Sequence, residues 1–221
     1  MKKVCGFWLP EREEHLVPFL QNGPIFAGGP TYQLHKLMPA MKFVKNFGHA
    51  VDVGAHCGLW SRPLSAMFNC VSAFEPIKEH LACFRANVAN EESWKNRNVR
   101  LWEYALGETE GMIKLTTGAN SSGDTYCDPD GEHEAMIARL DDCALPHGID
   151  FLKLDCEGFE YFALKGGEKT IREDKPVIIV EQKPGKGQNF GLAEDAAVKL
   201  LQEWGAHIRY VISGDYCLSW N

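Results

Sequence analysis

The sequence of 221 residues predicts a doubly wound α/β fold, in which helices cover both faces of a mostly parallel β-sheet. From residue 49 onward, short apolar runs alternate with segments of helical period, and this alternation is typical of right-handed βαβ units. The chain then ends in two strand-like runs, 207–212 and 216–220, on either side of Ser213-Gly214-Asp215. This last pattern predicts an antiparallel hairpin at one edge of the sheet.

Each element follows from the spacing of the apolar residues and of the turn residues. Strands are expected where short runs are apolar, and helices where apolar residues recur every three or four positions. The expected strands are 50–54, 71–74, 99–105, 151–154 and 177–180, with a hairpin strand at 112–115, and the expected helices are 59–68, 77–88, 159–171 and 192–204. Residues 117–134 are expected to form a long polar loop of the kind that is functional or mobile.

Residues 1–48 differ from the rest of the chain. Four prolines and the pair Gly28-Gly29 break the first thirty residues into short pieces, and a helical pattern over 31–47 is interrupted by Pro39. We therefore expect two parts, an N-terminal helical segment of residues 1–48 and a catalytic domain of residues 49–221. The segment is either a cover packed on the domain or a lid over a substrate pocket.

Composition excludes several classes of protein. The 30 acidic and 23 basic residues give a net charge of −7, which argues against nucleic acid as a partner. No apolar run approaches the roughly 18 residues of a membrane span, and the first apolar run is too short for a secretory signal. The eight cysteines include no C-x-x-C pair, so we expect packing thiols, no metal site and a cytoplasmic location.

Candidate ligand-binding residues stand where the strands end, because ligands of doubly wound sheets bind outside the carboxyl ends of the strands. Asp52 and the glycines Gly54 and Gly58 surround the end of the first strand. The glycines let the backbone approach a ligand closely, and a carboxylate there suits a ligand with an ammonium or sulfonium charge. Glu75 ends the second strand, where a carboxylate can accept hydrogen bonds from ribose hydroxyls or can begin the next helix.

The fourth strand carries the least ordinary residues of the predicted sheet. A period of two places Lys153 and Asp155 on one face, and a buried Lys153 needs Asp155 or Glu157 as a partner. The group is either a structural ion pair or part of a functional site. Glu181 ends the fifth strand in the same way, so carboxylates at four strand ends point toward one pocket.

With these motifs in this order, the chain resembles the FkbM-type family of S-adenosylmethionine-dependent methyltransferases. The matching stretches are 51–58, Ala73-Phe74-Glu75-Pro76, Tyr104-Ala105-Leu106-Gly107, Asn120-Ser121-Ser122-Gly123, 149–167 with its Asp155-Cys156-Glu157-Gly158 turn, and 175–181. The resemblance implies a class I methyltransferase, with a Rossmann-like seven-stranded sheet and S-adenosylmethionine as cofactor. It also implies methylation of a hydroxyl on a small molecule or sugar.

The resemblance also implies the roles of individual residues. Asp52, Gly54, Ala55 and Gly58 would line the methionine part of the cofactor, Glu75 would hold the ribose, and Tyr104 and Ala105 would border the adenine. Asp155 would face the cofactor amino group or the substrate. His56 stands where such proteins often carry an asparagine. For catalysis we expect Asp155 or Glu157 to remove the hydroxyl proton, with Lys153 tuning them.

Three alternatives remain open at the level of the sequence. A nucleic-acid 2′-O-methyltransferase also uses lysine and carboxylates around such a sheet, but the chain has no basic stripe. A nicotinamide-dependent reductase is disfavoured because G-x-G-x-x-G is absent. A non-catalytic binding module could keep the same fold, since fold does not fix function.

Overall fold

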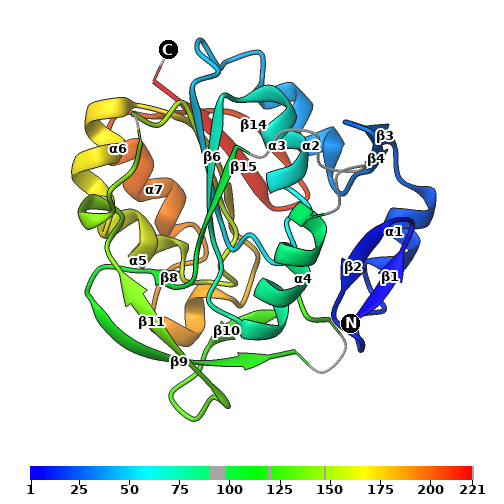
Figure 1. Cartoon of the computed structure of the whole chain (residues 1–221). Helices are drawn as coiled ribbons and strands as arrows, with labels where there is room; N and C mark the ends of the chain where they lie inside the picture. The colour runs from blue at the N-terminus through cyan, green and yellow to red at the C-terminus, as the bar shows by residue number, and fades with distance from the viewer. Residues whose placement is uncertain (90–97, 119–120, 147, 221) are drawn as a thin grey trace.

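The computed structural model describes residues 1–89, 98–118, 121–146 and 148–220. Asn120 of the quoted motifs and the C-terminal Asn221 lie outside these ranges. A seven-stranded sheet crosses the middle of the molecule (Figure 1). Its strands, in spatial order, are β14 (His207–Ile212), β15 (Asp215–Ser219), β13 (Val177–Glu181), β12 (Phe151–Leu154), β5 (His49–Val53), β6 (Cys70–Phe74) and β7 (Val99–Trp102).

Only β15 runs against the other strands of this sheet, since it pairs antiparallel with both β13 and β14. The doubly wound fold with a C-terminal antiparallel hairpin, predicted from the sequence, is therefore confirmed. The strand order reverses between the adjacent strands β5 and β12, from which the chain continues to opposite edges of the sheet. Ligands of open α/β sheets bind at such a switch point, outside the carboxyl ends of the strands.

Helices cover both faces of the sheet, and alternate residues of the central strands meet them (Figure 1). On one face, Val51, Leu152 and Ile178 pack in the cluster that holds helices α5 (Glu160–Lys165), α6 (Glu168–Asp174) and α7 (Ala196–Glu203). On the other face, Phe151 and Ile179 pack with α2 (Leu34–Ala40) and α3 (Ser61–Met67). Helix α4 (Lys78–Ala89) covers the same side near β7. Burial on both faces explains the continuous apolar runs of the sequence.

A second, four-stranded sheet departs from the prediction. It contains β10 (Thr125–Cys127), β9 (Gly111–Thr117), β11 (His133–Ala138) and β8 (Ala105–Leu106), in that order. Strand β10 and the first residues of β11 lie within residues 117–134, so the prediction of one long loop there is wrong. The predicted strand over 99–105 is divided as well, because β7 joins the large sheet and β8 joins the small one.

Four predicted helices are shorter than expected or divided, and one of them, expected over 192–204, is α7. The helix expected over 59–68 is α3, and the helix over 159–171 is divided into α5 and α6 at Gly166. A side chain at Gly166 would overlap the carbonyl oxygen of Gly107, so the close approach of two backbones requires glycine there. The helix expected over 31–47 ends at Ala40, directly after Pro39, which lacks the amide hydrogen that continues a helix.

The N-terminal segment contains more than helices. Two hairpins, β1 (Lys2–Val4) with β2 (Phe7–Leu9) and β3 (Ile25–Phe26) with β4 (Gly29–Pro30), flank α1 (Val17–Asn22) at one side of the molecule (Figure 1). The buried Lys36 ammonium forms an ion pair with Asp215 at the start of β15, and the buried Arg62 guanidinium donates to the carbonyl oxygen of Pro30. None of the helices in the described ranges has the length and hydropathy required to cross a bilayer.

Candidate functional site

Two neighbouring clefts lie at the carboxyl ends of β5, β6 and β12, where the switch-point rule places a ligand. The first, here named the apolar cleft, is lined chiefly by aromatic and aliphatic side chains, including Phe74, Tyr104, Leu106, Leu115 and Phe159. The second, the charged cleft, is lined by Tyr32 and Trp60 and by charged residues, including Lys153, Glu181 and Lys183. Both clefts share five wall residues, which are Gly54, His56, Gly123, Asp155 and Glu157.

The loop after β5 is closely packed against the loop after β12. Gly54 has a φ of +73°, and a side chain there would overlap the carbonyl oxygen of Asp155. Two non-glycine residues of these loops, His56 (φ 51°) and Glu157 (φ 54°), also adopt the left-handed conformation. Such backbone conformations cost free energy and concentrate at functional sites, where the surrounding structure holds them in place.

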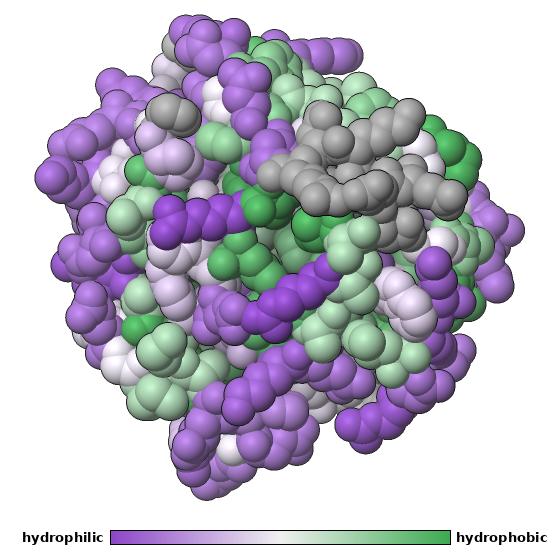
Figure 2. Space-filling model, viewed as in Figure 1, coloured by the Kyte–Doolittle hydropathy of each residue, from purple (hydrophilic) through white to green (hydrophobic). Residues whose placement is uncertain are grey.

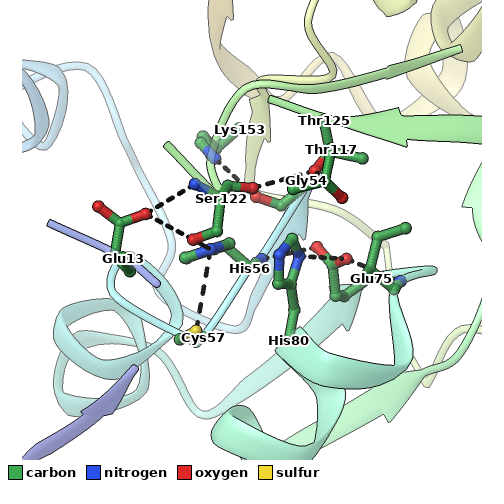
Figure 3. A network of polar contacts seen from close by, with 11 residues as sticks. Glu13, Gly54, His56, Cys57, Glu75, His80, Thr117, Ser122, Thr125 and Lys153 are labelled. Atoms are coloured by element: carbon green, nitrogen blue, oxygen red, sulfur yellow. Dashed lines mark hydrogen bonds and ion pairs between the residues drawn. The ribbon is translucent and has the colours of Figure 1, made fainter. Parts of the chain in front are cut away.

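Glu75 forms the polar end of the apolar cleft, and its side chain is buried. Its Oε2 accepts a hydrogen bond of 2.8 Å from the backbone N–H of His56, and its Oε1 accepts one of 2.9 Å from the N–H of Ile77. Nδ1 of the buried His80 lies 3.0 Å from the same Oε1. Figure 3 shows His80 between His56 and Glu75. Together, the contacts with His56, Ile77 and His80 hold the Glu75 carboxylate in one orientation.

Asp52 and Lys153 are neighbours in the register of β5 and β12, on the face that α2 and α3 cover. Nζ of Lys153 lies 3.5 Å from an oxygen of Asp52 and 3.5 Å from an oxygen of Asp155. Burial disfavours the charged form of Lys153, but Asp155 and Asp52 outweigh it and raise the lysine pKa. The lysine therefore stays protonated between two carboxylates.

Asp155 is held ionised by its cationic neighbours. Burial alone would raise the pKa of this carboxyl, but the ammonium groups of Lys153 and Lys183 outweigh it and lower the pKa. The charged cleft holds two further carboxylates, Glu157 and Glu181, and oxygen atoms of all three lie within 4.8 Å of one another. Glu157 pairs with Lys186 at 2.5 Å, and Glu181 pairs with Lys183 at 2.5 Å.

Glu181 differs from Asp155 in its charge state. Burial and the neighbouring Asp155 carboxylate raise the pKa of Glu181 to about 9, although Lys183 lowers it. Burial, with a smaller effect of Asp155, also raises the pKa of Glu157. The cluster thus separates its members into an ionised group, Asp155, and a protonated one, Glu181, and such differences are typical of catalytic sites.

The structure brings most of the predicted site residues together. Gly54, His56, Glu75, Tyr104, Ala105, Asp155 and Glu157 line the apolar cleft, and Ala55 and Lys153 line the charged cleft. Asp52 and Gly58 line neither. Asp52 is fully buried below the clefts, where it accepts a hydrogen bond of 2.6 Å from the Ser61 hydroxyl. Among the described residues, its carboxylate faces Lys153 and helps to keep that lysine protonated. A direct contact between Asp52 and a ligand stays a prediction.

Several wall residues could not be identified from the sequence. His15, Tyr32 and Trp60 line the charged cleft, and Ser122 lines the apolar cleft. The N-terminal residues reach the cleft through contacts that span about half the chain, and no local pattern reports such contacts. His80 could have been identified from the sequence. It lies in the first turn of the helix that follows Glu75, and from there its side chain can reach that carboxylate.

In the view of Figure 2, hydrophilic residues cover the rim of the molecule, and hydrophobic residues gather near the centre of the face.

The described cysteines are all free thiols, of which Cys57, Cys83 and Cys217 are buried. The expectation that all eight serve as packing thiols is wrong for Cys5, which is exposed.

Comparison with known proteins agrees with this geometry. A family model for the methyltransferase FkbM domain matches residues 52–208. The FkbM methyltransferase structure from Methylobacillus flagellatus KT has a TM-score of 0.54 and 19% identity, covering 78% of this chain and 43% of that protein. At this identity the likeness shows the fold, and the chain spans less than half the length of that relative.

Two further structures match at lower scores. The precorrin-6y C5,15-methyltransferase from Geobacter metallireducens GS-15 has a TM-score of 0.45 and 16% identity, covering 83% of this chain and 87% of that one. A SAM-dependent methyltransferase from Aquifex aeolicus has a TM-score of 0.46 and 16% identity, covering 85% of this chain and 87% of that one. A search of curated proteins gives no match.

Proposed function

Because the chain belongs to the FkbM methyltransferase family, whose domain matches residues 52–208, we propose that it transfers a methyl group to a hydroxyl oxygen of a small molecule or sugar. The cofactor is S-adenosylmethionine, and the family predicted from the sequence is confirmed. The observation that carries the proposal is the position of Asp155 on the wall shared by both clefts. The Asp155 carboxylate can therefore face a methyl donor in the apolar cleft and a methyl acceptor in the charged cleft.

The residues of the apolar cleft fit the cofactor. Phe74, Tyr104 and Leu106 offer an apolar surface for a nucleobase. An ionised carboxylate has about four acceptor positions, and Glu75 uses three of them toward His56, Ile77 and His80. The remaining position suits a ribose hydroxyl. On this basis Glu75 holds the ribose, Tyr104 and Ala105 border the base, and the Gly54–Ala55 backbone meets the methionine part.

The chemistry requires few groups from the protein. S-adenosylmethionine supplies a methyl group that its sulfonium already makes electrophilic. The chain must position the acceptor hydroxyl and remove its proton. Asp155 takes this proton, because Lys153 and Lys183 keep the carboxylate ionised and therefore able to accept one. Glu157, the other predicted base, is engaged by Lys186.

Binding and turnover measurements test the function in turn. Calorimetry should show binding of S-adenosylhomocysteine and no binding of NAD. Methyl transfer from S-adenosylmethionine carrying a labelled methyl group should then label a hydroxyl of small-molecule or sugar acceptors, whereas RNA should remain unlabelled. Binding of NAD alone would support a reductase instead, and binding without transfer to any acceptor would support a non-catalytic module.

The variant Asp155→Asn tests the proposed base. It should lower kcat by about 10²- to 10⁴-fold, the contribution of a general base, without weakening S-adenosylhomocysteine binding. Asp195→Asn is the matched control, because Asp195 lines neither cleft and its side chain is 45% exposed. Wild-type turnover in Asp155→Asn would remove Asp155 from the mechanism.

A further inference from the structure

Glu13 joins the N-terminal segment to the loop between β9 and β10. Its side chain is fully buried. Oε1 accepts a hydrogen bond of 2.8 Å from the N–H of Leu16. Oε2 accepts two more, from the backbone N–H of Ser122 at 2.8 Å and from the Ser122 hydroxyl at 2.5 Å. Both oxygens are thus held by donors, and one donor is a side chain on the wall of the apolar cleft.

The direction of these hydrogen bonds determines which ring nitrogen of His56 carries the hydrogen. An ionised carboxylate only accepts, so the single hydrogen of the Ser122 hydroxyl is directed to Glu13. Nε2 of His56 lies 2.7 Å from the same hydroxyl oxygen. Because that oxygen has no second hydrogen to donate, Nε2 must carry the hydrogen of the ring. Figure 3 shows the serine between the carboxylate and the imidazole.

His56 is neutral in this arrangement. Burial, and then the neighbouring His80, lowers the pKa of His56 well below its usual range. The rings of these two histidines lie edge to face with centroids 4.2 Å apart. A neutral imidazole has one N–H and one acceptor nitrogen. With Nε2 as the donor, Nδ1 is the acceptor.

The three residues stand between the two clefts. His56 lines both of them, and Ser122 lines the apolar cleft. His15 and Leu16, which follow Glu13, line the charged cleft. The hydrogen bonds between Glu13 and Ser122 and between Ser122 and His56 therefore connect a wall of the charged cleft to the wall that both clefts share.

We propose that Glu13 is a positioning residue, which orients the Ser122 hydroxyl and so fixes His56 as its Nε2–H tautomer. A change of tautomer would exchange donor and acceptor on the shared wall, and a ligand that met a lone pair would then meet an N–H. The consequence for methyl transfer rests on the proposed function, whereas the tautomer itself does not. Glu13 lies outside residues 52–208, which match the family model.

A purely structural role for Glu13 predicts a different outcome from a positioning role. A structural clamp would hold the loop and leave the tautomer of His56 unchanged when the loop stays folded. A positioning residue must change the tautomer when its own hydrogen-bonding character changes. Glu13→Gln makes this change at nearly constant shape. When its nitrogen is directed toward Ser122, the new amide can donate to the Ser122 oxygen, which frees the hydroxyl hydrogen to donate to Nε2 of His56. When its nitrogen is directed toward Leu16, the hydroxyl still donates to the glutamine oxygen, and in either orientation the amide N–H meets a backbone N–H.

Nitrogen NMR of protein labelled at histidine tests the proposal directly, without any ligand. Wild-type His56 should show a protonated Nε2 and an unprotonated Nδ1, with its signals assigned by their loss in His56→Asn. Glu13→Gln should leave a mixture of tautomers that includes Nδ1–H His56, and Ser122→Ala should also leave a mixture. Glu14→Gln is the matched control, because the neighbouring Glu14 side chain is 76% exposed and pairs with Lys2.

Activity gives the second measurement. Glu13→Gln should reduce kcat/KM for methyl transfer by about 10- to 100-fold, the usual effect of losing a group that orients a histidine. Glu14→Gln should match the wild type. If Glu13→Gln does not fold, Ser122→Ala alone decides the question by NMR. Retention of the Nε2–H tautomer in every folded variant overturns the proposal. A tautomer that shifts in a protein without methyl transfer upholds the positioning and refutes the proposed function.

Discussion

The apolar and charged clefts share a wall but are built from different parts of the chain. Apart from Tyr104 to Leu106 and the neighbouring β9–β10 region, the apolar cleft is formed by residues that follow the central strands β5, β6 and β12. The charged cleft adds His15, Tyr32 and Gln33 from the N-terminal segment. On the proposed assignment of the two clefts, cofactor and acceptor would have walls of different origin. The family fold supplies the first, and a segment outside the family match supplies much of the second.

Lys36→Ala should have a large effect on stability, because it breaks one buried ion pair that attaches the N-terminal segment. The Lys36 and Asp215 side chains are 5% and 3% exposed. Removing one partner of a buried ion pair leaves the other charge uncompensated, which costs about 3–5 kcal/mol of unfolding free energy. Urea denaturation measures this loss. If the two clefts are as separate as their walls suggest, S-adenosylhomocysteine should still bind under conditions where the variant is folded.

A surface pair provides the control for Lys36. Lys199 and Asp195 are 61% and 45% exposed, so Lys199→Ala should change the unfolding free energy by only about 0–1 kcal/mol. The double variant Lys36→Met with Asp215→Asn should recover part of the lost stability, since it leaves no unpaired charge. Equal stability losses in Lys36→Ala and Lys199→Ala would show that the segment is attached by other contacts.

Glu75→Gln should affect the apolar cleft alone. The amide replaces one acceptor oxygen with a donor, which then meets the backbone N–H of His56 or of Ile77. Loss of hydrogen bonds to a charged group weakens binding by about 1.5–3 kcal/mol, which is roughly 10- to 150-fold in Kd. Calorimetry with S-adenosylhomocysteine measures it. Tyr32→Phe, in the charged cleft, should leave this Kd at the wild-type value.

The opposite pattern would contradict the division into two clefts. If Tyr32→Phe weakened S-adenosylhomocysteine binding as much as Glu75→Gln, the cofactor would extend across the shared wall into the charged cleft. If Glu75→Gln instead raised only the KM of the acceptor, the two ligands would occupy the clefts in the reverse order.

Glu181→Gln should change the pH dependence of the unfolding free energy. The folded-state pKa of Glu181 is raised to about 9 from the ordinary value of 4.5. Between these values the folded protein keeps a proton that the unfolded chain has lost, so the unfolding free energy falls as pH rises from about 5 to about 9. Glutamine does not titrate and should flatten this part of the curve. Denaturation from pH 5 to 9 measures both proteins, and parallel curves would contradict the raised pKa.

The predictable part of the site follows from strand ends. Asp52, Glu75, Asp155 and Glu181 could be located because apolar runs mark where buried strands end, and parallel strands bring their ends to one edge. Glu13 could not be located in this way. Its partner Ser122 lies 109 positions away, and a buried glutamate between two other glutamates has no local pattern. Only the tertiary structure brings these residues together.

The small sheet shows the same limit in the fold. Strand β10 contains only Thr125-Tyr126-Cys127, too few residues for an alternating pattern, and turn residues such as Gly123 and Gly131 stand on either side. Its pairing with Thr117 and Leu115 of β9 defines the strand. The central strands of the large sheet, β5, β6, β12 and β13, were predictable because each is a buried, mostly apolar run that can be identified alone.

The buried pair of Lys36 and Asp215 has a consequence for the order of folding. These residues are 179 positions apart, so Lys36 can form this contact only after the chain has been made through Asp215. Contacts of high sequence separation form slowly, because they require the closure of a long loop. The residues that line the apolar cleft end at Phe159. A nascent chain can therefore contain the whole lining of the apolar cleft before this ion pair can attach the segment of residues 1–48 to β15.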